Sequence, residues 1–206
     1  PRTQTLNGIP HIELYVTWIY AFVTMPHLAL QLKGDFVNVT RFVPAEGVDA
    51  ALLLPVECTG CREAHPNAVA MEPSNIAELQ KSRGEANLVI NCPACRRENS
   101  ATFVVRKPGS KDESGLGEVS PWSEIVPDDG APAWHTLCTI DFRGINPLDV
   151  RIDGLLTESS SWTCAGSESG TLFTDMVFEE GEWHDYDDKA GDEVAITDVE
   201  FRWVKL

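Results

Sequence analysis

Apolar residues along this chain gather in short runs, which clusters of Gly, Pro, Asn and Asp separate. Short apolar runs between turn-forming clusters are typical of β-strands. The pattern therefore predicts a mainly β protein, with strands at Ala29–Leu32, Ala51–Val56, Leu88–Asn91, Ala101–Val105, Leu137–Phe142, Leu172–Phe178 and Val194–Val204.

Few segments have the periodicity of a helix. The best is Ser74–Arg83, where Ser74 could cap the first turn and Ile76 and Leu79 would share one face. We expect one or two short helices at most.

A different composition separates two parts of the chain. Residues 107–132 are rich in Gly, Pro, Ser and acids and have almost no apolar periodicity, which predicts a linker or a long loop. We expect a β domain on each side of it, at residues 25–106 and 133–206. Residues 1–24 would then be an N-terminal extension outside the fold.

Short segments resemble one another across this linker. Leu32-Lys33-Gly34 resembles Phe142-Arg143-Gly144, and Arg83–Ile90 resembles Ala190–Thr197. The spacing between the partners is nearly the same in both pairs. These matches predict two similar β-sheet domains related by internal pseudo-symmetry.

Four of the six cysteines form two C-x-x-C pairs, Cys58-Thr59-Gly60-Cys61 and Cys92-Pro93-Ala94-Cys95. Two thiolates three residues apart on a tight turn can bind one metal ion, and a second such turn completes a tetrahedron of sulfur ligands. Four sulfur ligands leave no coordination position for water, so the site would be structural rather than catalytic. The pattern predicts one Zn²⁺ ion bound by Cys58, Cys61, Cys92 and Cys95, in a protein that is not an enzyme.

An alternative is a thiol oxidoreductase or a metal-transfer protein that uses the C-x-x-C pairs. Against a redox site, there are two pairs rather than one, and neither opens a convincing helix. Cys138 and Cys164 lack such partners and are expected to be buried free thiols. Cys164 falls near the position of Cys58 in the predicted duplication, so the second domain would be a copy without metal.

Other residue types add no catalytic signature. The sequence contains no Ser/His/Asp pattern, P-loop or G-x-G-x-x-G run. His65 could replace a cysteine as a metal ligand, although four cysteines suffice. His135 and His184 stand beside tryptophans and are expected to pack or to lie at the surface.

Length and hydropathy predict a globular protein without membrane spans. The chain has 206 residues, of which 43% are hydrophobic, enough for a packed core. The longest apolar run, Ile12–Met25, is shorter than the roughly 18 residues that a membrane span needs, and it lacks the flanks of a secretory signal. Paired C-x-x-C motifs favour metal over disulfides in a reducing compartment, so we expect a cytoplasmic protein, with the nucleus as the other location.

The charge is unevenly distributed. The formal net charge is −16, yet the segment around the cysteines is locally basic, and Arg62, Arg96 and Arg97 could offset the charge of four thiolates. The second half is strongly acidic and would repel nucleic acid and membranes, which argues against a nucleic-acid-binding zinc ribbon. It could attract a basic protein partner, or it could simply be a solvated surface.

Several longer motifs resemble one known family, the eukaryotic CXXC-motif-containing zinc-binding proteins. The resemblance runs from near Met25 to the C-terminus. It includes both C-x-x-C motifs, the latter followed by Arg96–Ser100, together with Leu28–Lys33, Phe142–Gly144, Glu168–Asp175 and Trp183–Lys189.

This resemblance implies two similar β domains, one zinc ion on the four named cysteines and no established catalytic activity. It also implies a metal-handling protein partner that carries a heavy-metal-associated domain. We expect a monomer. Residues 1–24 precede the usual start of the family, at Met25, and Gly109–Pro132 is longer than usual in it.

Overall fold

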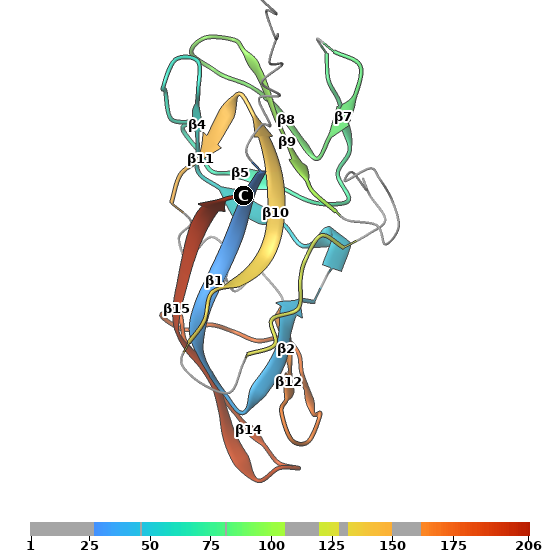
Figure 1. The fold of residues 1–206 in the computed structure, drawn as a ribbon, viewed down its shortest axis with the longest axis vertical. Coiled ribbons are helices and arrows are strands. Elements are labelled where there is room, and N and C mark those ends of the chain that lie inside the picture. The colour runs from blue at the N-terminus through green and yellow to red at the C-terminus, as the bar shows by residue number, and fades with distance from the viewer. Residues whose placement is uncertain (1–26, 46, 81, 106–119, 128–131, 150–161) are drawn as a thin grey trace, which may run out of the picture.

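An antiparallel sheet of six strands runs through the length of the molecule (Figure 1). The computed structural model describes residues 27–45, 47–80, 82–105, 120–127, 132–149 and 162–206. The order of strands in the sheet is β14-β15-β1-β10-β9-β8. Their bounds are β1 (His27–Val37), β8 (Leu88–Asn91), β9 (Glu98–Phe103), β10 (His135–Arg143), β14 (Trp183–Asp187) and β15 (Asp192–Lys205).

Smaller sheets flank this large one. β2 pairs with β12 and β12 with β13, while β4 pairs with β11, β3 with β5, and β6 with β7. The bounds are β2 (Val39–Pro44), β3 (Leu52–Leu54), β4 (Val56–Cys58), β5 (Val69–Met71), β6 (Ala77–Glu78), β7 (Glu85–Ala86), β11 (Ile145–Pro147), β12 (Trp162–Gly166) and β13 (Leu172–Phe173). The helix of the described residues is one short 3₁₀ turn, Gly47–Asp49.

Strands from both predicted domains share the central sheet. β1 lies between β15 and β10, which both come from the second half of the chain. β10 in turn pairs with β9 of the first half. The predicted boundaries, 25–106 and 133–206, therefore do not divide the chain into two separate sheets.

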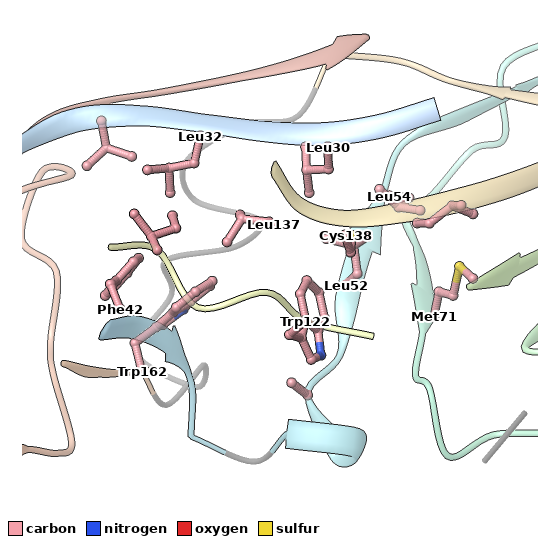
Figure 2. Close-up of a cluster of buried hydrophobic side chains, with 14 of the residues drawn as sticks. Leu30, Leu32, Phe42, Leu52, Leu54, Met71, Trp122, Leu137, Cys138 and Trp162 are labelled. Carbon is pink, nitrogen blue, oxygen red and sulfur yellow. The ribbon is translucent and has the colours of Figure 1, made fainter. Parts of the chain in front are cut away.

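The apolar core lies against one face of the central sheet. Figure 2 shows Leu30 and Leu32 of β1 above Phe42 of β2 and Trp162 of β12. The rings of Phe42 and Trp162 stack with centroids 4.6 Å apart and an interplanar angle of 12°. The Trp122 side chain is also buried there, so the short segment 120–127 closes part of the core.

The mainly β character is confirmed, but the predicted helix at Ser74–Arg83 is wrong. This segment contains β6 and turns back into β7, and Leu79 N donates to Gly84 O at 3.0 Å. The buried amide of Asn87 donates to the carbonyl oxygens of Pro73 and Asn75, at 2.8 and 3.1 Å. These bonds hold the backbone in an irregular course, and Ile76 remains 43% exposed, so a helix here would gain little burial.

One predicted strand is shorter than expected. Of Leu172–Phe178 only Leu172–Phe173 is a strand, because Asp175 adopts a φ of 56° that interrupts extended pairing. The predicted extension, residues 1–24, and most of the predicted linker, residues 107–132, lie outside the described residues. Within the described part of the chain, no helix has the length and apolarity to span a membrane.

We predict that Phe42→Ala destabilises the whole fold, because Phe42 is fully buried and stacks on Trp162. Removing such a ring costs about 3–5 kcal/mol of unfolding free energy. Leu172→Ala is the control, since Leu172 is 66% exposed, and should change stability by less than about 0.5 kcal/mol. Urea denaturation would measure both, and equal effects would contradict the assignment of the core.

Candidate metal centre

Each C-x-x-C motif forms a tight turn with the same backbone hydrogen bonds. In the first turn, Cys58 N donates to Glu63 O at 2.9 Å and Arg62 N to Cys58 O at 2.8 Å. In the second, Cys92 N donates to Arg97 O and Arg96 N to Cys92 O, both at 2.9 Å. The residue after each pair has a left-handed φ, 63° at Arg62 and 60° at Arg96. This conformation reverses the chain and aims both thiols of a turn in one direction.

The two turns bring the four sulfur atoms together. Cys58 Sγ lies 3.7 Å from Cys95 Sγ, and Cys61 Sγ lies 3.5 Å from Cys92 Sγ. All four sulfurs lie within 4.8 Å of one another. A tetrahedral zinc ion with Zn–S bonds of about 2.3 Å requires sulfurs about 3.8 Å apart. The geometry and the all-thiol donor set therefore fit a single zinc ion.

The two ends of this cluster differ in exposure. Cys58 and Cys92 are buried, with 4% and 3% of their surface exposed, whereas Cys61 and Cys95 are exposed. One edge of the cluster therefore faces solvent, and the other rests on the protein.

Backbone N–H groups favour the thiolate form of the two buried cysteines. The N–H of Cys61 is the main reason that the pKa of Cys58 falls to about 6, and the N–H of Cys95 lowers the pKa of Cys92 in the same way. The Glu63 N–H acts in this direction on Cys61, but the neighbouring thiol of Cys92 and burial raise the pKa of Cys61 to about 12. Zinc binds thiolates, so the turns stabilise the zinc-binding thiolate form at Cys58 and Cys92, the two buried cysteines of the cluster.

An arginine side chain packs against the first turn. A Cβ atom built on Gly60 would lie 2.8 Å from Cζ of Arg97, so glycine at this position leaves room for the guanidinium. Four thiolates on Zn²⁺ carry a net charge of about −2, which the guanidinium partly offsets.

A segment from the second half of the chain holds the first turn in place. Thr59 N donates to Gly144 O at 3.0 Å, and Ile145 of β11 pairs with Cys58. Gly144 has a φ of 77°, and a Cβ there would overlap the side chain of Asn99. The Asn99 amide is buried and lies 4.0 Å from Cys58 Sγ. Sequence reasoning did not assign roles to Gly144 and Asn99, although both lie in the motifs that carry the family resemblance.

Cys138, Cys164, His65 and His184 are not part of this cluster. Cys138 and Cys164 are buried free thiols, as expected. Burial raises the pKa of Cys138, and burial together with the Asp185 charge raises the pKa of Cys164 to about 12. His65 Nδ1 lies 2.7 Å from Asn67 O, and His184 Nε2 lies 3.3 Å from Glu182 Oε2. The predicted ligands are thus the residues that the fold brings together.

Comparison with known proteins agrees with this geometry. Residues 29–204 match the family described as CXXC motif containing zinc binding protein, eukaryotic. The chain belongs to this family. The expected resemblance is confirmed, and a family named for zinc binding fits a chain with one four-cysteine cluster in its described part.

Individual members of the family are similar over nearly their whole length. The human CXXC motif containing zinc binding protein is 28% identical over 181 residues, which cover 88% of this chain and 99% of the human one. A UPF0587 protein of Schizosaccharomyces pombe is 29% identical over 177 residues, 86% of this chain and 97% of that protein.

Solved structures show the same fold. The crystal structure of C1orf123 matches with a TM-score of 0.69 at 28% identity and covers 87% of this chain and 99% of that one. A hypothetical protein from Plasmodium falciparum matches with a TM-score of 0.65 at 16% identity, over 86% of this chain and 99% of that one, which shows a shared fold alone.

We predict that Gly144→Ala weakens metal retention by displacing the buried Asn99 beside Cys58. The methyl group adds a steric overlap to the unfavourable left-handed φ, so the cost should be about 1–3 kcal/mol. Gly170→Ala is a matched control, because Gly170 has a φ of 66° but no atom within 4 Å of the added Cβ.

The measurement is the rate at which a chelator removes zinc from each variant. Gly144→Ala should release zinc several-fold faster than Gly170→Ala. Equal rates in the two variants would show that the contact with Asn99 does not support the cluster.

Proposed function

We propose that Cys58, Cys61, Cys92 and Cys95 bind one structural zinc ion and that the protein acts as a non-enzymatic binding or adaptor module. The observation that carries this proposal is the arrangement of the four sulfurs, all within 4.8 Å of one another. Four thiolate ligands fill a tetrahedral zinc ion and leave it no site for a substrate or a reactive water.

The position of the cluster in the fold supports a structural role. β8 is an edge strand of the central sheet, and the second turn follows it directly. β4 lies in the separate β4–β11 sheet and leads into the first turn. A zinc ion between the turns would cross-link the edge of the large sheet to this smaller sheet.

The charge of the chain supports a protein partner rather than nucleic acid or a membrane. The net charge is −16, and the exposed acids of the second half include Glu182 just before β14, Asp185 on it and Asp188 just after it. Such a surface would attract a basic partner and repel phosphates. A metal-handling protein with a heavy-metal-associated domain, a monomeric state and a cytoplasmic or nuclear location remain predictions from the sequence.

One observation favours the alternative, a metal-transfer protein or a thiol oxidoreductase. Cys61 and Cys95 are exposed, so the thiols of a partner or an oxidant could reach them. A structural site would hold zinc against exchange, whereas a transfer site would release it to a competing thiol acceptor.

Metal content and thiol chemistry of the purified protein separate these functions. The structural proposal expects one zinc per chain, slow alkylation of the four thiols and no disulfide after exposure to oxidised glutathione. Rapid zinc loss to an acceptor would favour transfer, and a reversible disulfide within a C-x-x-C pair would favour redox activity.

The adaptor role needs its own test. We expect that a partner which binds the wild type at low salt no longer binds the triple variant, in which Glu182, Asp185 and Asp188 are all changed to their amides. The zinc content of that variant should stay at one per chain. Binding that does not depend on these acids would contradict the proposed acidic surface.

We predict that Cys92→Ser lowers zinc affinity and loosens the two turns. Structural zinc contributes about 10–16 kcal/mol in small zinc peptides, and less is expected here because a packed β core also supports the fold. Amide hydrogen exchange should accelerate at residues 52–61 and 88–103, with residues 172–178 little changed.

Cys164→Ala is the control, since it removes a buried thiol outside the cluster and should keep one zinc per chain. Unchanged exchange in Cys92→Ser would mean that zinc is not structural. Uniform acceleration of exchange across the chain would mean that both halves unfold as one cooperative unit, which the zinc site stabilises as a whole.

A further inference from the structure

A second pair of turns in the chain has the same backbone hydrogen bonds as the two cysteine turns. Gly166 N donates to Thr171 O at 2.8 Å and Gly170 N to Gly166 O at 2.9 Å, as Cys58 and Arg62 do in the first cysteine turn. Gly191 N donates to Asp187 O at 2.7 Å, as Arg96 does to Cys92 O. We call residues 166–171 and 187–192 the second clip, and residues 58–63 and 92–97 the cysteine clip.

The left-handed positions of the two clips also correspond. Arg62 and Gly170 have φ of 63° and 66°, and Arg96 and Gly191 have φ of 60° and 78°. Each of these residues lies four positions after the start of its turn.

The strands around the clips pair in the same register. Asn91 pairs with Glu98 beside one turn, and Tyr186 pairs with Glu193 beside its counterpart. Cys58 pairs with Ile145, and Gly166 pairs with Val39.

The order of the central sheet is also symmetric about the β1–β10 pair, with β15 and β14 on one side and β9 and β8 on the other.

Each clip is held by a turn from the other half of the chain. Thr59 N donates to Gly144 O at 3.0 Å, and Ser167 N donates to Asn38 O at 2.9 Å. Gly144 and Asn38 both have a left-handed φ, 77° and 54°.

These correspondences put Gly166, Ser169, Asp187 and Ala190 at the positions of Cys58, Cys61, Cys92 and Cys95. Burial follows the same pattern. Gly166 and Asp187 are buried like Cys58 and Cys92, and Ser169 and Ala190 are more exposed.

The predicted alignment of the halves is in a different register. The sequence match pairs Gly34 with Gly144 and Gly84 with Gly191, and it places Cys164 near Cys58. Gly84 has a φ of 149° and Gly191 of 78°, so their backbones differ. Cys164 stands two residues before Gly166 and thus at the position of Val56, and both are 1% exposed core residues.

A carboxylate occupies the centre of the second clip. Asp187 is 1% exposed, and its Oδ1 accepts hydrogen bonds from Thr171 Oγ1 at 3.0 Å, Lys189 N at 3.1 Å and Ala190 N at 3.2 Å. Ser169 Oγ donates to the other oxygen, Oδ2. The hydrogen bond from Ser169 is the main reason that the pKa of Asp187 is lowered, so the side chain is ionised at neutral pH.

Gly166 leaves the space that this carboxylate fills. A Cβ atom at Gly166 would overlap Asp187 Oδ2. The carboxylate therefore takes the room that a cysteine side chain at this position would need.

We propose that the second clip has the backbone of a zinc-binding clip but is held together without metal. The Asp187 carboxylate, hydrogen-bonded across both turns, holds the turns together in place of the ion. The backbone retains the geometry for four sulfur ligands, so the second clip is a latent zinc site. This inference rests on the proposed zinc role of the cysteine clip.

The test restores the four cysteines. In the variant Gly166→Cys, Ser169→Cys, Asp187→Cys and Ala190→Cys, we expect zinc content to rise from one to two ions per chain, measured by elemental analysis. Adding Cys92→Ser to this variant should bring the content back toward one. The two-ion result requires that the backbone of the second clip can place four sulfurs around a metal.

The outcomes separate this inference from the proposed function. Wild type without zinc would overturn the proposed function of the cysteine clip. Wild type with one zinc and a folded four-cysteine variant also with one would overturn the latent site.

A second variant tests the carboxylate itself and does not depend on metal. Asp187→Ala should raise amide exchange at residues 162–173 and 183–196 by about tenfold or more, because it removes several charge-assisted hydrogen bonds at once. Zinc content should stay at one.

Asp188→Ala, at the exposed neighbouring acid, is the control and should leave exchange unchanged. If Asp187→Ala matches Asp188→Ala in exchange, the carboxylate does not hold the clip, and the proposal fails.

Discussion

The pairing of β1 with β10 is the interaction on which the rest of the fold depends. It joins the first and second halves of the chain at the middle of the central sheet, and every other strand of that sheet is added on one side or the other. Leu30 and Leu32 on β1 and Leu137 and Ile140 on β10 are fully buried, so the pair also supplies one wall of the core. A strand pairing between distant segments has a high entropic cost of closure, which the burial of this wall offsets.

Because the β1–β10 pair lies at the middle of the sheet, the hairpin ends of the two halves need cross-links of their own. The clips stand at the ends of hairpins, where exposed backbone and polar side chains leave little apolar area to bury. In one half, four cysteines can take a metal ion, and in the other, a buried carboxylate accepts hydrogen bonds from both turns. The turn that steadies each clip comes from the opposite half, at Gly144 or Asn38, so the tips are coupled to the central pair.

The cysteine cluster could be predicted from the sequence because its information is local. A C-x-x-C turn fixes the direction of its own two thiols, and two such turns supply the four ligands of a tetrahedral zinc site without a further residue. Most strands were also predictable from short apolar runs. The shared sheet was not, since nothing in the apolar pattern of β1 specifies whether its neighbour is near or far in sequence.

The errors have physical reasons as well. Ser74–Arg83 has too few apolar positions to outweigh the hydrogen bonds of the buried Asn87 amide with the carbonyls of Pro73 and Asn75. The second clip could not be predicted from the sequence, because it has no cysteine. Glycine can occupy any left-handed position, so the sequence alone matches Gly84 with Gly191 although their φ angles differ. Asp187 resembles many other acids of this chain until its partners in space are known.

The central claim is that four sulfur atoms from two turns surround one zinc ion. X-ray absorption at the zinc edge of the purified protein tests it most directly, because it reports the number and type of ligand atoms and their distances. The account predicts four sulfur ligands at about 2.3 Å and no nitrogen or oxygen ligand. A shell that contains nitrogen or oxygen, or fewer than four sulfurs, would contradict it.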